Sequence, residues 1–334
     1  MRLLTVLAVL ATACHSDCNP SSSDAGTSLD VAHSQPPSDD AGPSPARLRV
    51  TNKCEVDVWI QQQGFPTDPL VKLAKDASHE YQIPAAGLAS TRFWPKILCD
   101  KNGNNCAIGQ SSPPCPAKGC APPVDSKLEA TWGCTLTDKT KCGYTPQGVQ
   151  MIDTYWNASA VDGYTLPFAM TLKGGDGRAS CIPVDCAGLA TAKCPTDEDL
   201  SNGGQNPLYA HQNLATKNPA TSGPFAGGYA GCFSTCTKLN YPGWGGDGLN
   251  APAGPVEQMY CCPTPPISSP QCQAGPVAKT KYVESIHKAC KNTTYGYAYD
   301  DGLGGRNCSG DTIIEFVVGP KCVEIAAAKS AAKK

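Results

Sequence analysis

The chain has 334 residues, of which 40% are hydrophobic, and a formal net charge of −2 at pH 7. This length suits one large domain or two ordinary ones, and the near-neutral charge provides no basic face for a nucleic-acid partner. Its 33 glycines and 30 prolines, set against 7% aromatic residues, favour many short strands and turns over a helical bundle.

The N-terminus predicts export from the cytoplasm. An arginine precedes an apolar run from Leu3 to Ala13, which is too short to span a bilayer and is typical of a signal peptide. Two interpretations of residues 1–13 remain open: an ordinary signal peptide, or a bacterial lipoprotein signal with Cys14 as the lipidated first residue. We favour the lipoprotein because the peptide is short and Cys14 follows the site directly. Lipidation would leave Cys18 without an obvious partner.

Two polar segments flank the region expected to fold. Residues 14–46 are rich in Ser, Asp and Pro and predict a disordered tether, and residues 323–334 predict a solvated basic Ala/Lys tail. No second long apolar run occurs, so we expect contact with a membrane only through a lipid anchor. The protein is then either anchored to a bacterial membrane or secreted.

Twenty cysteines dominate the chemistry of the chain. Apart from Cys14 and Cys18, eighteen lie between Cys54 and Cys322, and their density in an exported chain predicts a disulfide framework. No C-x-x-C motif occurs and the five histidines are scattered, so we expect no metal and no cofactor.

Alternating apolar residues predict strands along the whole region. They occur in residues 48–60, at Tyr81 and Ile83, in residues 128–132, in residues 164–172 and in residues 314–318. Strands at both ends imply one β-domain that the chain leaves and re-enters, and a sandwich is the simplest such architecture. Residues 97–126 predict a small disulfide lobe. Residues 180–290 predict a second lobe, with one helix in AKTKYVESIHKAC.

The stretch YWNASAVDGYTLP places Asp162 between aromatic residues, where the chain enters a strand. Aromatic side chains beside an acid suit a sugar-binding groove, whereas an Asp before Gly163 also suits an ordinary turn. Both interpretations stand on the residues alone.

Several segments together resemble the thaumatin-like protein family, which includes plant pathogenesis-related antifungal proteins. They are VTNKCEVDVWI, TRFWPKILC, VDGYTLP, MYCC and KYVESIHKACKNTTYGYAYDD, in this order. The resemblance covers residues 47–322 and implies a mainly β fold: a thaumatin-like β-sandwich with a disulfide-rich helical lobe and a small disulfide-stapled loop domain. It implies a monomer and the disulfides Cys54–Cys322, Cys99–Cys106, Cys115–Cys120, Cys181–Cys308, Cys186–Cys290, Cys194–Cys232, Cys236–Cys261 and Cys262–Cys272. Cys134 and Cys142 remain, and we expect them to close an extra local loop.

The resemblance also implies an acidic cleft, lined in the family by one Arg, one Glu and three Asp, that binds β-1,3-glucan. Matched position by position, these residues fall on Lys96, Glu129, Asn157, Asp162 and either Asp300 or Asp301. Two positions depart from the family, since Lys replaces Arg at Lys96 and Asn replaces Asp at Asn157. Arg92 lies four residues before Lys96, and Asp153 would reach the lost Asp position only by a register shift.

The departures bear on catalysis because Asn cannot act as a general base and Lys lacks the planar fork of Arg. Glu129 and Asp162 remain as the acid pair that glycoside hydrolysis needs. For stacking on sugar rings, the alternating Tyr295, Tyr297 and Tyr299 are candidates if they share a face, although packing in the core is the competing interpretation. Trp244, in a glycine-rich stretch, is the best candidate for an exposed aromatic residue.

Three functions remain open from the sequence. The first is binding of β-1,3-glucan or a similar cell-wall polysaccharide. The second is weak endo-β-1,3-glucanase activity through Glu129 and Asp162. The third is a protein-directed role, such as inhibition of a hydrolase or non-enzymatic antifungal action. We favour polysaccharide binding.

Overall fold

The computed structural model describes residues 46–111, 123–219, 227–320 and 322. All of them belong to one unit of the chain, residues 44–334. The expected signal peptide, the lipidation site Cys14, nearly all of the tether, the basic tail and the Cys115–Cys120 pair lie outside the described residues. Within the described part, no helix has the length and apolar character needed to cross a bilayer.

The first sheet has five strands and joins the two ends of the folded region. Its spatial order is β10 (Val184–Cys186), β9 (Phe168–Lys173), β14 (Ile313–Val318), β1 (Ala46–Asn52) and β4 (Ser78–Gln82). The first strand, β1, runs parallel to the last, β14, with Leu48 opposite Ile314 and Asn52 opposite Val318. The expectation that the chain leaves a β-domain and re-enters it is confirmed.

The second sheet has six strands, with every neighbouring pair antiparallel. Its order is β13 (Arg306–Cys308), β7 (Thr154–Ser159), β6 (Lys127–Trp132), β5 (Leu88–Ile97), β2 (Val58–Gln63) and β3 (Leu70–Leu73).

The two sheets pack through one hydrophobic core. The ring of Tyr81 on β4 lies 4.8 Å from that of Phe93 on β5, and the Arg47 guanidinium on β1 lies 5.9 Å from the Trp132 ring on β6. Buried residues alternate along β2 and β14, as a pleated strand with one buried face requires, whereas every residue of β6 is buried. The predicted mainly β fold is therefore confirmed.

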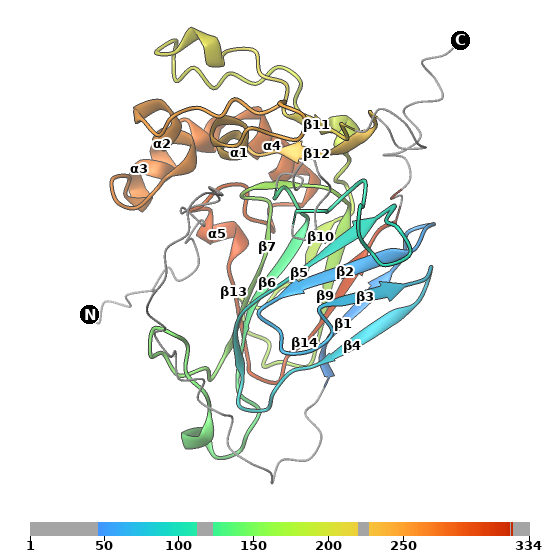
Figure 1. Ribbon diagram of the computed structural model, residues 1–334. Coiled ribbons are helices and arrows are strands. Elements are labelled where there is room, and N and C mark those ends of the chain that lie inside the picture. The colour runs from blue at the N-terminus through green and yellow to red at the C-terminus, as the bar shows by residue number, and fades with distance from the viewer. Residues whose placement is uncertain (1–45, 112–122, 220–226, 321, 323–334) are drawn as a thin grey trace, which may run out of the picture. The chain divides into compact units, whose positions relative to one another are not determined.

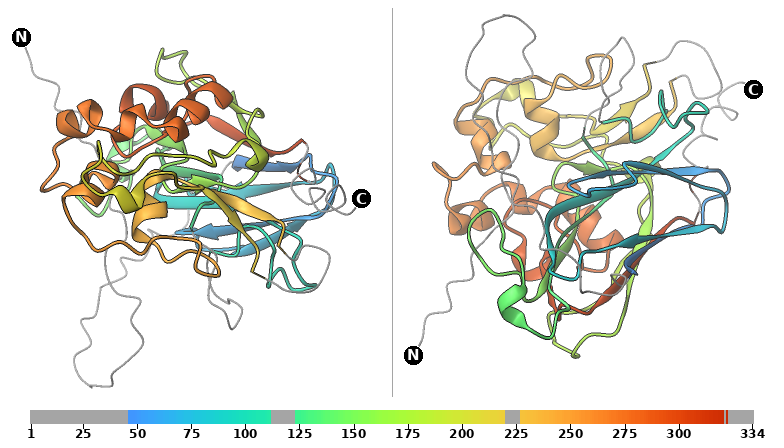
Figure 2. Two further views of the ribbon diagram at one scale, coloured as in Figure 1. Left: turned by 90° about the horizontal axis from the view of Figure 1, so that it is seen from above. Right: turned by 60° about the horizontal axis from the view of Figure 1, so that its bottom comes forward.

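Most helices occur in residues 180–290, called the helical lobe below. It contains α1 (Thr235–Asn240), α2 (Pro255–Cys261), α3 (Ser269–Ala274) and α4 (Lys281–Ala289), and Figure 1 and Figure 2 show these helices gathered apart from strands β1–β4. Two short strands of the lobe, β11 (Ala215–Lys217) and β12 (Tyr229–Phe233), pair in a small sheet with β8 (Gly163–Tyr164). A last short helix, α5 (Asp301–Gly304), precedes β13.

Helix α4 matches the helix expected from the sequence. The Thr280 side chain caps it by accepting a hydrogen bond from the Val283 backbone, and its buried side chains are Tyr282, Val283 and Ile286. The Tyr282 hydroxyl donates to the Ala160 carbonyl at 2.6 Å. This bond ties the helical lobe to the chain segment just after β7.

Eight disulfides join cysteines of the described residues. They are Cys54–Cys322, Cys99–Cys106, Cys134–Cys142, Cys181–Cys308, Cys186–Cys290, Cys194–Cys232, Cys236–Cys261 and Cys262–Cys272. These are pairs that the family resemblance implied, together with the extra local loop closed by Cys134 and Cys142. Three of them join residues more than 100 positions apart: Cys54–Cys322, Cys181–Cys308 and Cys186–Cys290. Of these, Cys181–Cys308 ends on β13, and Cys186–Cys290 joins β10 of the five-stranded sheet to the end of α4.

Candidate functional site

The six-stranded sheet has one apolar face, toward the core, and one polar face. Register defines the polar face, because residues directly opposite each other in an antiparallel pair point to the same side. On β6 the apolar Leu128 and Ala130 alternate with Lys127, Glu129 and Thr131. The polar face comprises Trp59, Gln61, Gln63, Arg92, Trp94, Lys96, Lys127, Glu129, Thr131, Tyr155, Asn157, Ser159 and Asn307.

Three of these residues form a row across β5, β6 and β7. Arg92 is opposite Glu129, and Glu129 is opposite Asn157. The Arg92 Nε atom lies 2.7 Å from Glu129 Oε1, with 39% of the Arg92 side chain exposed. Asn157 is only 7% exposed, and its buried Oδ1 atom has no hydrogen-bond partner among the described residues. The row therefore places an exposed guanidinium donor, a carboxylate that is 11% exposed and a buried, unpartnered amide oxygen side by side.

Asp162 lies beside this row and pairs with Lys127. It follows β7 and precedes β8, and its carboxylate accepts a hydrogen bond from the Lys127 ammonium, which is buried. Burial by itself would lower the pKa of Lys127, but Asp162 and Glu129 together outweigh it and raise that pKa. The Lys127 ammonium thus interacts with both candidate carboxylates, and 39% of the Asp162 side chain remains exposed.

A third carboxyl group, Asp125, lies close enough to Lys127 and Asp162 to interact with both. It is 4% exposed and accepts a hydrogen bond from the Ser111 hydroxyl. Burial raises the pKa of Asp125 to about 6, against the attraction of Lys127 and the hydrogen bond from Ser111, which lower it. Its second oxygen, Oδ1, is buried with no hydrogen-bond partner in the described part of the chain.

Lys96 occupies a different place from the one expected of a ligand-binding residue. It is 1% exposed, its ammonium donates to Gln61 Oε1 at 3.3 Å, and burial lowers its pKa to about 8. The cation beside Glu129 is Arg92 instead. Residues 92 and 96 share a face of β5, but only residue 92 is in register with Glu129, so the ligand-binding role expected of Lys96 stays a prediction.

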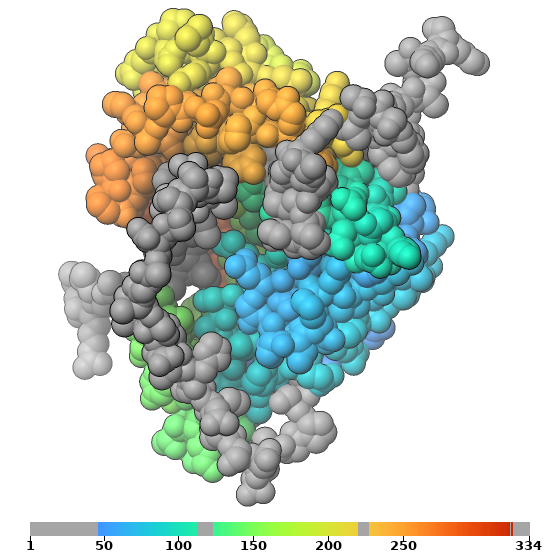
Figure 3. Space-filling model, in the orientation of Figure 1, coloured from blue at the N-terminus to red at the C-terminus, as the bar shows by residue number. Residues whose placement is uncertain are grey.

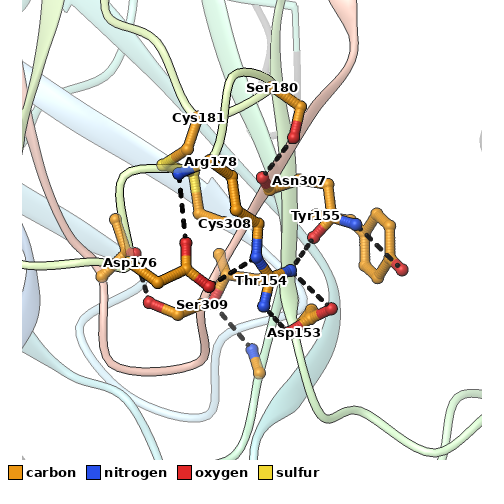
Figure 4. Close-up of polar contacts among 12 residues, drawn as sticks. Asp153, Thr154, Tyr155, Asp176, Arg178, Ser180, Cys181, Asn307, Cys308 and Ser309 are labelled. Carbon is orange, nitrogen blue, oxygen red and sulfur yellow. Dashed lines mark hydrogen bonds and ion pairs between the residues drawn. A yellow bond between two sulfur atoms is a disulfide. The ribbon is translucent and has the colours of Figure 1, made fainter.

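Asp153 does not reach the row, because another residue binds it. Arg178 contacts both of its carboxylate oxygens, with Nη1 2.7 Å from Oδ2 and Nη2 3.0 Å from Oδ1 (Figure 4). The Arg178 Nε atom lies 2.5 Å from Asp176, and Nη1 donates to Asn307 Oδ1 at 3.0 Å. No register shift brings Asp153 to the position of Asn157.

The two C-terminal candidates differ in accessibility. Asp300 is buried, with its Oδ2 atom 2.6 Å from His287 Nε2 on α4 and bonded to the Gly296 backbone N–H at 2.9 Å. Asp301 is exposed and accepts a hydrogen bond from the Tyr295 hydroxyl at 2.6 Å. Asp300 is therefore committed to holding α4, and Asp301 is the one that faces solvent.

The tyrosines of residues 295–299 do not form a shared platform. The segment consists of an isolated bridge and turns, so its alternation does not place the rings on one face. The Tyr295 hydroxyl bonds Asp301, the Tyr299 hydroxyl contacts Thr264, and Tyr297 is buried. Trp244 is also buried, 5% exposed, which corrects its expected exposure.

Sequence reasoning missed two residues of this site and undervalued a third. Lys127 had a detectable signal, since residues 127 and 129 alternate along β6 and so point the same way. Asp125 precedes the strand, and no local pattern places its side chain. Arg92 and Lys96 lie on the same face of β5, and alternation along the strand does not distinguish them. Only the register between β5 and β6 shows that Arg92 is the residue opposite Glu129.

Other features of the described residues offer weaker chemistry. The one group with metal-ligand spacing is Cys236, Glu257 and Cys261, and its two sulfurs are joined in a disulfide, so neither is a thiolate. A cavity of about 660 Å³ lies against α4, lined among others by Tyr164, Lys193 and Lys288. It does not include the candidate carboxylates.

Figure 3 shows the helical segments (orange) and the strands (blue to teal) as adjoining parts of one side of the molecule.

Comparison with known proteins identifies relatives over nearly the whole region. "Glucan endo-1,3-beta-glucosidase" of Prunus avium is 27% identical over 282 residues, covering 80% of this chain and 88% of the relative. "Thaumatin-like protein 2" of Prunus persica is 26% identical over 279 residues, with coverage of 80% and 88%.

Among solved structures, the GH family 64 laminaripentaose-producing beta-1,3-glucanase of Paenibacillus barengoltzii aligns with 12% identity and a TM-score of 0.43. The alignment covers 83% of this chain and 76% of that one. A similarity this low has no bearing on function. The family model described as "Thaumatin family" matches residues 52–318, most of the described chain. The chain therefore belongs to the thaumatin family.

Proposed function

We propose that this protein is an exported polysaccharide-binding protein that recognises β-1,3-glucan or a similar polymer on the polar face of its six-stranded sheet. The ligand lies in a cleft between that face and the helical lobe. Membership of the thaumatin family and the name of the Prunus avium relative support this class of ligand.

The observation that carries the proposal is the row of Arg92, Glu129 and Asn157. Sugar hydroxyls both donate and accept hydrogen bonds, so a site for them needs donors and acceptors close together. The guanidinium supplies donors, the carboxylate supplies acceptors, and the buried Asn157 Oδ1 atom is unpartnered within the described residues. A ligand that displaces the side chains covering this atom would supply its missing partner and recover the free energy that its burial costs.

The charges of the site favour an uncharged polymer. Arg92 pairs with Glu129, and Lys127 pairs with Asp162, so each carboxylate has its own cation. A cationic ligand would compete with these internal partners, whereas a neutral glucan only has to hydrogen-bond to them.

The same pairing favours binding over hydrolysis. Glycosidases keep one carboxyl group protonated as the acid while the other is ionised. Here both candidate carboxylates are already held in ion pairs, Glu129 with Arg92 and Asp162 with Lys127. Weak endo-β-1,3-glucanase activity through these two residues is the second candidate, supported by the name of the Prunus avium relative.

Export is consistent with the disulfides, which persist in oxidising compartments. We propose a monomer that contacts polysaccharide and no nucleic acid. The relatives reported above come from Prunus species, and they lend no support to a bacterial lipid anchor at Cys14.

The test is to mix the oxidised full-length protein with insoluble β-1,3-glucan, sediment the polymer, and assay the supernatant for protein and for new reducing ends. Depletion of protein without new ends supports binding. New ends that vanish in both Glu129→Gln and Asp162→Asn would establish hydrolysis instead. Protein that stays in solution, with no sugar released, contradicts both functions.

A further inference from the structure

The polar face carries an exposed aromatic residue, Tyr155, which is the first residue of the stretch YWNASAVDGYTLP. Tyr155 is 48% exposed, whereas Trp94 on the same face is buried. It lies two residues before Asn157 on β7 and directly opposite Thr131 on β6. Tyr155 therefore points to the same side as the row of Arg92, Glu129 and Asn157, one position further along the strands.

A polar network holds the Tyr155 side chain in place (Figure 4). Asn307 is opposite Tyr155 across β7 and β13, and its Nδ2 atom donates to the Tyr155 hydroxyl at 3.4 Å. Asn307 Oδ1 in turn accepts from Arg178, which is fixed by both oxygens of Asp153. The ring is thus anchored at its hydroxyl.

We propose that Tyr155 forms an aromatic subsite that stacks on one pyranose ring of a polysaccharide, while the adjacent sugar unit occupies the row of Arg92, Glu129 and Asn157. The inference rests on the proposed function and extends it by a second binding position. It also gives the bound polymer a direction, along β7 from Asn157 toward Tyr155.

Spacing and preorganisation both support this subsite. Residues two apart in a strand are separated by about 7 Å, which is close to the length of one sugar unit. A tyrosine has only two side-chain torsions, and a ring already anchored loses little further entropy on binding. Within the described chain, none of the ring-to-ring contacts involves Tyr155, so its faces are not occupied by another aromatic side chain.

Tyr144 provides a matched control. It is 60% exposed, lies in the loop after β6, and is outside the polar face. The experiment measures the affinity of full-length wild type, Tyr155→Ala, Tyr155→Phe and Tyr144→Ala for a soluble β-1,3-glucan by titration calorimetry. Thermal unfolding of each variant confirms that it is folded.

We expect Tyr155→Ala to weaken binding about tenfold, as for an aromatic anchor at an interface. Tyr155→Phe keeps the stacking face but loses the hydroxyl contact with Asn307, so its affinity should lie between those of wild type and Tyr155→Ala. Tyr144→Ala should not differ from wild type. Equal affinities of Tyr155→Ala and Tyr144→Ala, with wild type binding, overturn the subsite and leave the proposed function standing. Absence of binding by the wild type overturns both.

Discussion

Arg92 and Glu129 face each other across β5 and β6, with the Arg92 Nε atom 2.7 Å from Glu129 Oε1. This pairing makes Arg92 the cation of the site. Lys96 lies four residues further along β5 on the same face, where it is buried and hydrogen-bonded to Gln61. The two residues are therefore expected to respond differently to substitution.

Replacing each cation by Met separates their roles. Arg92→Met should weaken binding to β-1,3-glucan about tenfold, because it removes a charge-assisted donor next to the row. Its effect on the free energy of unfolding should stay below about 1 kcal/mol, since Arg92 is partly exposed. Lys96→Met should leave the affinity unchanged. Sedimentation with the polymer and denaturant unfolding measure the two effects, and loss of binding in Lys96→Met would contradict the assignment.

The buried Asp125 should make stability depend on pH. Its pKa is about 6 in the folded protein against 3.8 for the unperturbed group, so the folded state binds more protons than the unfolded chain between about pH 4 and 6. The contribution of Asp125 to the free energy of unfolding is therefore greatest below pH 4 and is lost as the pH rises, by about 3 kcal/mol in all.

Asp125→Asn removes this dependence. The free energy of unfolding of the variant relative to wild type should rise by about 3 kcal/mol between pH 4 and pH 7, as measured by denaturant titration at each pH. A difference between the two proteins that stays constant over this range would show that burial does not protonate Asp125.

The ion pair of Lys127 and Asp162 should show energetic coupling. Lys127→Met leaves the Asp162 carboxylate without its cation, but that side chain is 39% exposed and water partly compensates. We expect a loss of about 1 to 2 kcal/mol in the free energy of unfolding. Adding Asp162→Asn should recover part of it, with a coupling energy of about 1 kcal/mol in a double-mutant cycle. Strict additivity would mean that the pair contributes nothing.

Two disulfides that join residues at very different separations test how the stabilisation by a disulfide depends on the length of the loop it closes. Cys54–Cys322 closes a separation of 268 residues, whereas Cys134–Cys142 closes 8. Replacing both cysteines of a pair by Ser should cost about 5.5 kcal/mol for the long closure and about 2.5 kcal/mol for the short one, on the loop-entropy model. Denaturant unfolding of the two double variants checks the order, and a larger loss from the short loop would contradict it.

Local patterns predicted much of the fold correctly. Alternation located β1, β6, β9 and β14, and strands at both ends of the region indicated one β-domain that the chain leaves and re-enters. The direct pairing of β1 with β14 came only from the structure. The same rule failed at Tyr295, Tyr297 and Tyr299, where alternating tyrosines lie in a bridge and turns. There the contacts of Tyr295 with Ser159 and Asp301 determine the backbone, and periodicity does not register such contacts.

The candidate site likewise combines features that the sequence predicts with features that depend on the tertiary structure. The sequence by itself determined that Glu129 lies on the polar side of a strand, because side chains alternate along a strand whatever its neighbours are. It also determined that Asp162 lies where the chain begins another strand. Only the tertiary structure decided that Arg92 meets Glu129, that Lys127 reaches Asp162, and that Tyr155 stands exposed beside Asn157. The physical reason is that register and burial depend on contacts between segments far apart in the chain, and no local pattern encodes them.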